Sequence, residues 1–376
     1  MYTVEVIDSL ERFNDVRKDW ERLYNQKQYS ILFSYDYVYT YFQVLHKKFP
    51  QARICVFLVK DATGNIVAIF PFNLEERRSL FLLHLKILYV RDFQLLPFYY
   101  LLIDTSVDVK NVIETLVGFL KNNKIWDICH WNNIYADAGY FEYIFKEFSK
   151  DFLVQTSITE TLVIDINTDF QEYLRQNWNK KDIKELKRQY RRLSEFGPVR
   201  LVEVSTGEDI EHALAELYKI EDKNWKGRMG TSLQKTHQGL FFEKLIHLSS
   251  WDHKVRLFFL QVGSRNIAGL YTIFYRGTCN LLKMGYDESY YRYSPSTVLL
   301  YLVFEHLYGE GTVKQINCTG DFYSYEQQFG HTTWKKNKLF IYRKGPRTRF
   351  YILYSQLISP FIRKFIDRIT NRHVLN

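Results

Sequence analysis

The residues whose types and spacing suggest chemistry lie in the stretch 281–334, near the C-terminal end of the chain. This stretch predicts a strand, a polar turn and a helix that begins at Ser294-Pro295. Proline at the first helical position gives up no hydrogen bond, and we expect the Ser294 hydroxyl to cap the free amides. Exposed N–H groups at a helix N-terminus attract anions such as phosphate. The pattern therefore predicts either an anion site or simply the start of a helix.

Two further segments carry side chains suited to substrate binding or proton transfer. One is the loop Trp225-Lys226-Gly227-Arg228, and the other is the tyrosine-rich stretch 320–330. The sequence lacks the dinucleotide fingerprint GxGxxG after its first strand, the Walker loop, HExxH and the GxSxG elbow. It therefore gives no support to a dinucleotide oxidoreductase, an NTPase, a zinc protease or an α/β-hydrolase.

Length and composition predict two domains, because 376 residues exceed the usual size of one domain and 46% of them are hydrophobic. The four cysteines are far apart and form no CxxC pair, so we expect no metal site and no disulfide, but buried free thiols in a reducing cytoplasm. The N-terminal residues do not resemble a signal peptide, and no apolar run reaches 18 residues.

The basic residues are concentrated in two places. From Arg343 onward, eight basic residues face one acidic residue, so most of the net charge of +9 belongs to the tail. The segment 180–192 holds seven basic and two acidic residues, including Lys187 and Arg191. Its exposed side is either a solvated face or a surface that receives a phosphate-bearing substrate. With the charge confined in this way, DNA or other nucleic-acid binding has weak support.

The tail has an apolar stripe opposite its basic residues, formed by Phe350, Leu353, Leu357, Phe361, Phe365 and Ile369. This pattern is typical of a basic amphipathic helix that lies on a membrane surface, here through residues 347–376. Packing of the same stripe on the body of the protein or on a second subunit is the alternative.

A repeat of about 200 residues organises the rest of the chain. Residues 253–274 repeat the pattern of residues 53–72: an apolar strand, a short glycine-containing turn and a returning strand, with Ala68 and Ala268 in register. Duplication of one α/β unit explains the repeat and the length, whereas chance similarity of two hairpins is the alternative. Helices are expected at 9–24 and 35–45, and a single helix at 169–195 carries the basic segment.

At this point the sequence resembles a known family. The second half is similar to the GNAT-like acyltransferase domain of the CelD-like family, a bacterial group that is named for cellulose biosynthesis and is related to the FemAB peptidyltransferases. The resemblance covers nearly all of residues 30–343. The pieces that carry it are Glu221-Asp222-Lys223-Asn224-Trp225-Lys226-Gly227-Arg228-Met229-Gly230-Thr231, Gly285-Tyr286-Asp287 with Tyr291 and Ser294-Pro295, Asn317 with Tyr325-Glu326 and Phe329-Gly330, and, in the first half, Phe33-Ser34-Tyr35-Asp36-Tyr37 and Ile69-Phe70-Pro71-Phe72.

The resemblance implies an α/β fold of two tandem GNAT-like domains, each a twisted mixed sheet flanked by helices, followed by the basic amphipathic helix. The expected boundaries are 1–160 for a structural or acceptor-binding domain, 161–343 for the domain with the acyl-donor site, and 344–376 for the tail. Acyl-CoA is implied as co-substrate, with no permanently bound cofactor. The chain departs from the family pattern at Ser296, where glycine is common, and at Asn317 and Glu326, where aspartate and lysine are usual.

A site can be assigned on this basis. Acyl-CoA is expected to place its pyrophosphate at Ser294, Ser296 and Thr297 and its thioester beside Met284 and Gly285. Glu221 or Asp321 is expected to take the proton from the attacking group, and Tyr286 or Tyr325 to protonate the leaving thiolate. Trp225, Lys226 and Arg228, together with Lys187 and Arg191, are assigned to substrate binding.

The expected reaction is transfer of the acyl group to an amino or hydroxyl group of a sugar, a glycolipid or a cell-envelope polysaccharide precursor. The expected location is the cytoplasm, including the inner face of the plasma membrane. One alternative is FemAB-like aminoacyl transfer to a peptidoglycan precursor, with the basic segment meeting the acceptor's phosphates. The other is a catalytically degenerate scaffold in polysaccharide assembly, which the changes at Ser296, Asn317 and Glu326 favour.

Overall fold

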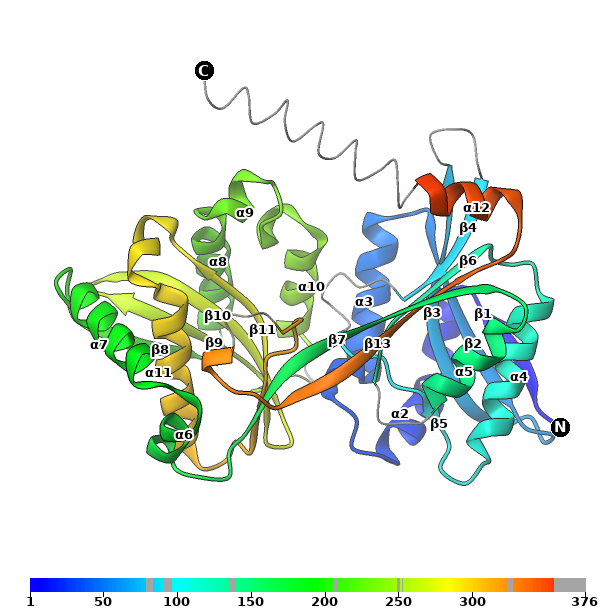
Figure 1. The fold of residues 1–376 in the computed structure, drawn as a ribbon, viewed down its shortest axis with the longest axis horizontal. Coiled ribbons are helices and arrows are strands. Elements are labelled where there is room, and N and C mark those ends of the chain that lie inside the picture. Colours follow the sequence, from blue (N-terminus) through cyan, green and yellow to red (C-terminus); the bar gives the residue numbers. More distant parts are fainter. Residues whose placement is uncertain are drawn as a thin grey trace, which may run out of the picture.

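A computed structural model describes residues 1–78, 84–90, 97–135, 140–205, 208–248, 251, 253–322 and 327–354. These residues form one 13-stranded mixed sheet with helices on both faces (Figure 1). The strands are β1 (Thr3–Ile7), β2 (Ala52–Lys60), β3 (Ile66–Arg78), β4 (His84–Tyr89), β5 (Leu102–Ile103), β6 (Ile128–Tyr135), β7 (Leu153–Asp165), β8 (Val199–Val204), β9 (Val255–Val262), β10 (Arg265–Tyr275), β11 (Thr278–Tyr286), β12 (Gln315–Asn317) and β13 (Thr333–Tyr342).

The helices surround this sheet in two groups, one in each half of the molecule (Figure 1). The α-helices are α1 (Leu10–Asp15), α2 (Arg17–Asn25), α3 (Tyr35–Lys48), α4 (Val109–Asn122), α5 (Tyr140–Ser149), α6 (Phe170–Asn177), α7 (Lys180–Ser194), α8 (Glu208–Asp222), α9 (Trp225–Arg228), α10 (His237–Ile246), α11 (Pro295–Glu310) and α12 (Pro346–Leu353). Short 3₁₀ helices lie at η1 (Ile31–Phe33), η3 (Leu233–Lys235) and η5 (Glu288–Tyr293).

The two predicted hairpins are present and correspond in register. Ala68 of β3 pairs with Val59 of β2, and Ala268 of β10 pairs with Leu260 of β9. In both hairpins the register shifts close to this alanine. The α/β fold with a mixed sheet, expected from the sequence, is therefore confirmed.

Two long strands join the halves of the sheet. The strand order is β1-β2-β3-β4-β6-β13-β7-β12-β11-β10-β9-β8, with β5 paired to β3. β13 lies between β6 and β7, and the last residues of β7 pair with β12. Figure 1 shows β7 and β13 as a twisted ribbon that crosses from one half to the other. A strand near the C-terminal end of the chain thus completes the sheet of the N-terminal half.

Two predicted helices are each divided in the structure. The segment 169–195, expected to be one helix, consists of two helices, α6 and α7. Trp178 lies between them and is buried. The Asn179 side chain caps the start of α7 by accepting a hydrogen bond from the Asp182 N–H at 2.9 Å. The helix expected at 9–24 is divided at Val16, which leaves the helical conformation with φ −89° and ψ 7°. An asparagine cap at extended φ and ψ starts a new helix, so the apolar spacing alone was insufficient here.

The core has one part on each face of the second half of the sheet. Helices α8 and α10 pack on one face in a cluster shared with the N-terminal half, and α11 packs on the other face with Leu186 and Leu193 of α7. All four cysteines are free. Cys55, Cys129 and Cys279 are buried, as predicted, whereas Cys318, which was also expected to be buried, is only partly buried. Burial raises the pKa of the Cys55 thiol to about 12.

The tail is described only as far as α12. Its predicted stripe continues beyond residue 354, so Leu357, Phe361, Phe365 and Ile369 lie outside the described residues. Among the described helices, none has the length and apolar character needed to cross a membrane.

Candidate active site

Strands β11 and β12 separate after a short parallel contact. They pair only through Thr278–Asn280 and Gln315–Asn317. Beyond this contact, β11 shifts its register against β10 between Tyr271 and Thr272, which leaves Leu282 as an extra residue. The chain that follows β12 stays with β7 instead, because the Cys318 N–H donates to Leu162 O at 3.0 Å and the Phe322 N–H donates to Glu160 O at 2.7 Å. The two strands therefore open into a V.

A cavity of about 320 Å³ lies in this opening and has two chemically different parts. Its apolar wall faces α11 and is formed by Leu162, Leu270, Leu281, Leu300, Phe304 and Phe329. Its polar wall faces the N-terminal half and includes Asn133, Lys283, Thr319, Asp321 and Lys336. A bulge redirects the side chains that follow it, so the register shift in β11 places Lys283 on the side opposite Leu281. The cavity thus passes through the sheet.

Lys336 is the main functional candidate that sequence reasoning missed. Its side chain is 2% exposed, and its Nζ donates to Asp321 Oδ1 at 3.2 Å, Gly320 O at 3.2 Å and Thr319 O at 3.4 Å. The ammonium group also lies 5.7 Å from the centre of the Phe98 ring. Burial of a charged group is costly, so a buried lysine needs partners such as these carbonyl oxygens and this carboxylate. Buried charged groups of this kind are frequent at functional sites.

Asp321, a predicted proton acceptor, does line the cavity beside this lysine. Its other oxygen lies 3.8 Å from Lys338 Nζ, and its side chain is 39% exposed. Two cations thus hold one accessible carboxylate at the polar wall.

Glu221, the other predicted proton acceptor, lies on α8 and does not line the cavity. It is 2% exposed, and both of its oxygens are engaged: Oε1 accepts from Lys226 Nζ at 2.7 Å and Oε2 accepts from the Leu233 N–H at 2.6 Å. Lys226 Nζ also lies 3.4 Å from Met284 O. This geometry favours a positioning role, in which Glu221 fixes the loop after α8 against the end of β11.

Gly285 permits this close packing. A Cβ atom at residue 285 would lie 2.9 Å from Glu221 Cβ and 3.1 Å from its Cα. Met284, the preceding residue, lines the cavity, whereas Tyr286 is half-buried and packs beside the cluster around α11. Tyr325 and Glu326 lie outside the described residues.

The predicted cap of α11 is wrong in its detail. Ser294 adopts a left-handed conformation, φ 46° and ψ 53°, and its side chain makes no capping hydrogen bond. Its carbonyl instead accepts from the Thr297 N–H at 3.0 Å and the Val298 N–H at 3.1 Å. Among the described residues, nothing accepts a hydrogen bond from the Ser296 N–H, so this amide is the donor left for an anion at this helix end.

The remaining predicted substrate-binding residues lie on α7 and on α9, and both of these helices contact η5, the segment that precedes α11. Arg228 of α9 is ion-paired with Glu288 of η5, and this hydrogen bond lowers the pKa of the Glu288 carboxyl. Trp225 is 50% exposed. Lys187 and Arg191 are exposed on α7, and the neighbouring Arg192 lies 5.1 Å above the Tyr293 ring, next to Ser294. The basic face of α7 therefore flanks the approach to α11.

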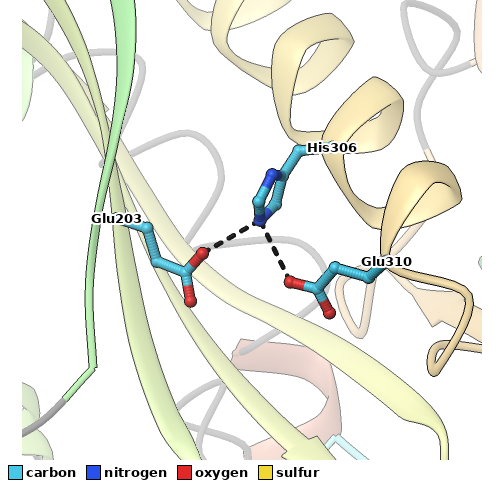
Figure 2. Close-up of side chains that lie close together, drawn as sticks. All are labelled: Glu203, His306 and Glu310. Atoms are coloured by element: carbon cyan, nitrogen blue, oxygen red, sulfur yellow. Dashed lines mark hydrogen bonds and ion pairs between the residues drawn. The ribbon is translucent and has the colours of Figure 1, made fainter.

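One cluster in the described part of the chain has side chains of metal-binding type (Figure 2). His306 Nε2 lies 2.9 Å from Glu203 Oε2 and 3.0 Å from Glu310 Oε1. Arg256 already bridges the same two carboxylates, at 3.3 Å from Glu203 and 2.6 Å from Glu310, and lies over Phe274. The cluster is therefore an ion-pair network that fastens α11 to β8 and β9, away from the cavity.

Comparison with known proteins agrees with this geometry. Residues 180–336 match the family model described as acetyltransferase (GNAT) domain. Residues 180–336 therefore correspond to a GNAT-type acetyltransferase domain. The matched region includes the V between β11 and β12, the whole of α11 and Lys336. A GNAT domain takes its acyl group from acyl-CoA, so the protein is an acyltransferase with acyl-CoA as co-substrate. A search of curated proteins finds no match.

Solved structures show that the fold extends over nearly the whole chain. FemX covers 94% of this chain and 99% of its own, with a TM-score of 0.56 at 11% identity. The C-terminal domain of a putative lysylphosphatidylglycerol synthetase from Agrobacterium fabrum covers 92% and 97%, with a TM-score of 0.52 at 10% identity. A tandem GNAT protein from the clavulanic acid biosynthesis pathway covers 91% and 99%, with a TM-score of 0.51 at 11% identity. At these identities the likeness concerns the fold alone.

Proposed function

We propose that the GNAT domain transfers an acyl group to an amino or hydroxyl group of a sugar, a glycolipid or a cell-envelope polysaccharide precursor, as expected for a CelD-like enzyme. The observation that carries the proposal is the cavity in the V, which has an apolar wall toward α11 and a buried lysine with an accessible carboxylate on the other side. An acyl donor and a polar acceptor can therefore meet from opposite faces of the sheet.

The donor enters from the side of α11. Its pyrophosphate lies near the Ser296 N–H, with Ser294 and Thr297 adjacent, and the basic residues Lys187 and Arg191 of α7 attract its phosphates. The thioester then reaches Met284 and the apolar wall, where Leu300 and Phe304 contact the acyl chain. Trp225, Lys226 and Arg228 shape the approach to this side.

Transfer takes place directly between donor and acceptor. The acceptor oxygen or nitrogen attacks the thioester carbon and gives its proton to Asp321, the C–S bond breaks, and the CoA thiolate takes a proton from Tyr286 or Tyr325. Lys336 holds Asp321 in position through its hydrogen bond to Oδ1. Glu221 acts on this site through the loop after α8.

The two domains and the tail have different roles. Residues 1–160 form the structural or acceptor-binding part, 161–343 hold the donor site, and 344–376 form a basic tail that contacts the inner face of the plasma membrane from the cytoplasm. A FemAB-like aminoacyl transfer is a second candidate, and the exposed basic face of α7 favours it because charged tRNA and peptidoglycan precursors carry phosphates.

Thermal unfolding in the presence of acetyl-CoA, longer acyl-CoAs and free CoA tests the proposal. A ligand that binds only the folded state raises the melting temperature. We expect acetyl-CoA and free CoA to stabilise the protein, and pantetheine, which lacks the pyrophosphate, to do so much less. Absence of any response to CoA compounds would contradict the proposal, and stabilisation by aminoacyl-tRNA instead would favour the second candidate.

A further inference from the structure

A second cavity, of about 380 Å³, lies next to the polar wall of the first. Thr319 stands between them: it lines the first cavity, and its N–H donates to Asn317 Oδ1, in the second cavity, at 2.8 Å. The strand register places Asn317, Trp334 and Lys336 on one face of the sheet. Trp334 lines the second cavity and Lys336 lines the first, so neighbouring residues on this face of the sheet contribute to both cavities.

Two buried asparagines form the floor of the second cavity. Asn280 and Asn317 are directly opposite each other on β11 and β12 and are 2% and 1% exposed. Asn280 Nδ2 donates to Ile273 O at 3.1 Å, but its Oδ1 is buried without a donor among the described residues. With the Asn317 Oδ1 already used, the Nδ2 of that residue remains as a donor. A neighbouring acceptor and donor suit a hydroxyl group, which donates and accepts.

Two cations without carboxylate partners lie at the rim, Arg276 and Lys314. Neither forms an ion pair with any described residue, and the one carboxylate in the wall, Asp165, accepts from Gln315 Nε2 at 2.8 Å. Arg276 and Gly277 form the turn between β10 and β11, with φ +48° and +78°. Asparagine and glycine are favoured in such a turn, whereas arginine is not. The left-handed backbone of Arg276 therefore has a conformational cost, which is the cost of having a positive charge at this position.

Aromatic rings complete the walls: Tyr29 and Tyr100, whose centroids are 5.2 Å apart, together with Tyr275 and Trp334. Flat apolar surfaces with a few polar groups of fixed position are the usual lining of a small-molecule site, and the volume falls within the range of roughly 300–1,000 Å³ for such sites. The Arg276 guanidinium lies 5.0 Å from the centre of the Tyr275 ring. Ring faces, paired hydroxyl-binding amides and cations without carboxylate partners together fit a sugar that carries a negative charge.

We infer that the second cavity binds the sugar ring of the acceptor through its hydroxyl groups and through a phosphate or carboxylate substituent. The hydroxyl groups contact Asn280 and Asn317, the anionic group lies between Arg276 and Lys314, and the reacting group reaches Asp321 and Lys336. This inference rests on the proposed acyl transfer and names the class of its acceptor.

Calorimetric titration of the full chain with glucose 1-phosphate, glucuronate, glucose and inorganic phosphate tests the inference. We expect the two anionic sugars to bind at least tenfold more tightly than either glucose or inorganic phosphate. Equal affinity for inorganic phosphate and glucose 1-phosphate would overturn the sugar site, and equal affinity for glucose would overturn the role of the cations.

Variants locate the site. Arg276→Asn and Lys314→Met should each weaken glucose 1-phosphate binding at least tenfold. Asparagine is favoured at this turn position, so Arg276→Asn should keep or raise the melting temperature, which separates binding from folding. Arg265→Asn, which removes an exposed arginine at the other end of β10, is the matched control and should change neither quantity. Undiminished binding in Arg276→Asn and Lys314→Met would overturn the inference.

The same samples titrated with acetyl-CoA separate this inference from the proposed function. Stabilisation by acetyl-CoA without sugar binding overturns only the inference that the second cavity binds the acceptor sugar. Sugar binding without any acetyl-CoA response overturns the proposed transfer and leaves a sugar site.

Discussion

Lys336 Nζ lies 3.2 Å from Asp321 Oδ1, and the lysine is buried while the carboxylate remains accessible from the cavity. The two residues come from β13 and from the segment that follows β12, and both segments are hydrogen-bonded to β7, which brings them to the same place. This pair gives the sharpest test of the site.

Replacing Lys336 with methionine should reduce kcat/KM about 100-fold, since loss of one fixed charged donor in an active site costs roughly 10²–10³ in rate. Asp321 is partly exposed and can be hydrated instead, so we expect a stability loss below about 2 kcal/mol. The measurement is release of free thiol from acetyl-CoA in the presence of the acceptor. Lys338→Met, which removes the more distant cation at 3.8 Å, is the control and should retain most activity. Equal activity of Lys336→Met and wild type would remove Lys336 from the mechanism.

Glu221→Gln should mainly affect stability. The change keeps the shape of the side chain but removes the charge that pairs with Lys226, and we expect a loss of about 1–3 kcal/mol in the free energy of unfolding. Urea unfolding measures the loss, and Glu216→Gln, at an exposed ion pair on the same helix, should cost less than about 0.5 kcal/mol. A large fall in kcat with an unchanged unfolding curve would instead make Glu221 the proton acceptor.

Gly285→Ala and Gly309→Ala should have opposite effects. The added methyl group at residue 285 meets Glu221 at 2.9 Å, and overpacking of this kind costs roughly 1–3 kcal/mol. At residue 309 of α11 nothing lies within 4 Å, so alanine should stabilise the helix by about 0.5–1 kcal/mol. Differential scanning calorimetry compares the two, and a tolerated alanine at 285 would contradict the close packing of α8 on β11.

Ser296→Asp separates helix stability from donor binding. A carboxylate in the first turn of α11 interacts favourably with the helix dipole, which is worth about 0.3–1 kcal/mol. The same charge repels a pyrophosphate, so the melting temperature without ligand should stay or rise while the shift caused by acetyl-CoA disappears. Ser296→Ala is the neutral control and should keep a clear acetyl-CoA shift. An undiminished shift in Ser296→Asp would place the pyrophosphate elsewhere.

His130 should make stability depend on pH. Burial, with a smaller effect of Arg77, lowers the pKa of this imidazole to about 4, whereas an unfolded chain has a histidine pKa near about 6.5. Between these two pKa values the unfolded state therefore binds more protons than the folded state. The contribution of neutral His130 to the free energy of unfolding is fully present above about pH 6.5 and is lost as the pH falls toward 4. His130→Phe, which keeps the ring contact with Phe340, should flatten the pH dependence of urea unfolding in this interval. An unchanged slope would contradict a histidine that stays neutral in the folded protein.

The sequence was sufficient for features that depend on neighbours in the chain. The two hairpins around Ala68 and Ala268 follow from apolar strands and a glycine turn, and the start of α11 follows from Pro295. The conformation of Ser294 did not follow, because a left-handed serine cannot be distinguished from an extended one by residue type. The cap prediction failed for this reason.

Lys336 shows why the rest of the site was out of reach. Lys335 and Lys336 are adjacent, and only the register of β13 against β7 decides that Lys335 is exposed and Lys336 buried. A shift of one residue would exchange them, since side chains alternate between the faces of a strand. The pairing joins segments far apart in the chain, so no local pattern contains it.

The place of β13 between β6 and β7 has a consequence for how the protein is made. During synthesis, residues 1–160 leave the ribosome long before residues 333–342 are made. Until then, the edges of β6 and β7 that will pair with β13 have no partner strand. Unpaired strand edges favour association with other chains. We therefore expect folding to finish only when synthesis is nearly complete, and truncation before residue 333 to yield an aggregating chain instead of a folded N-terminal half.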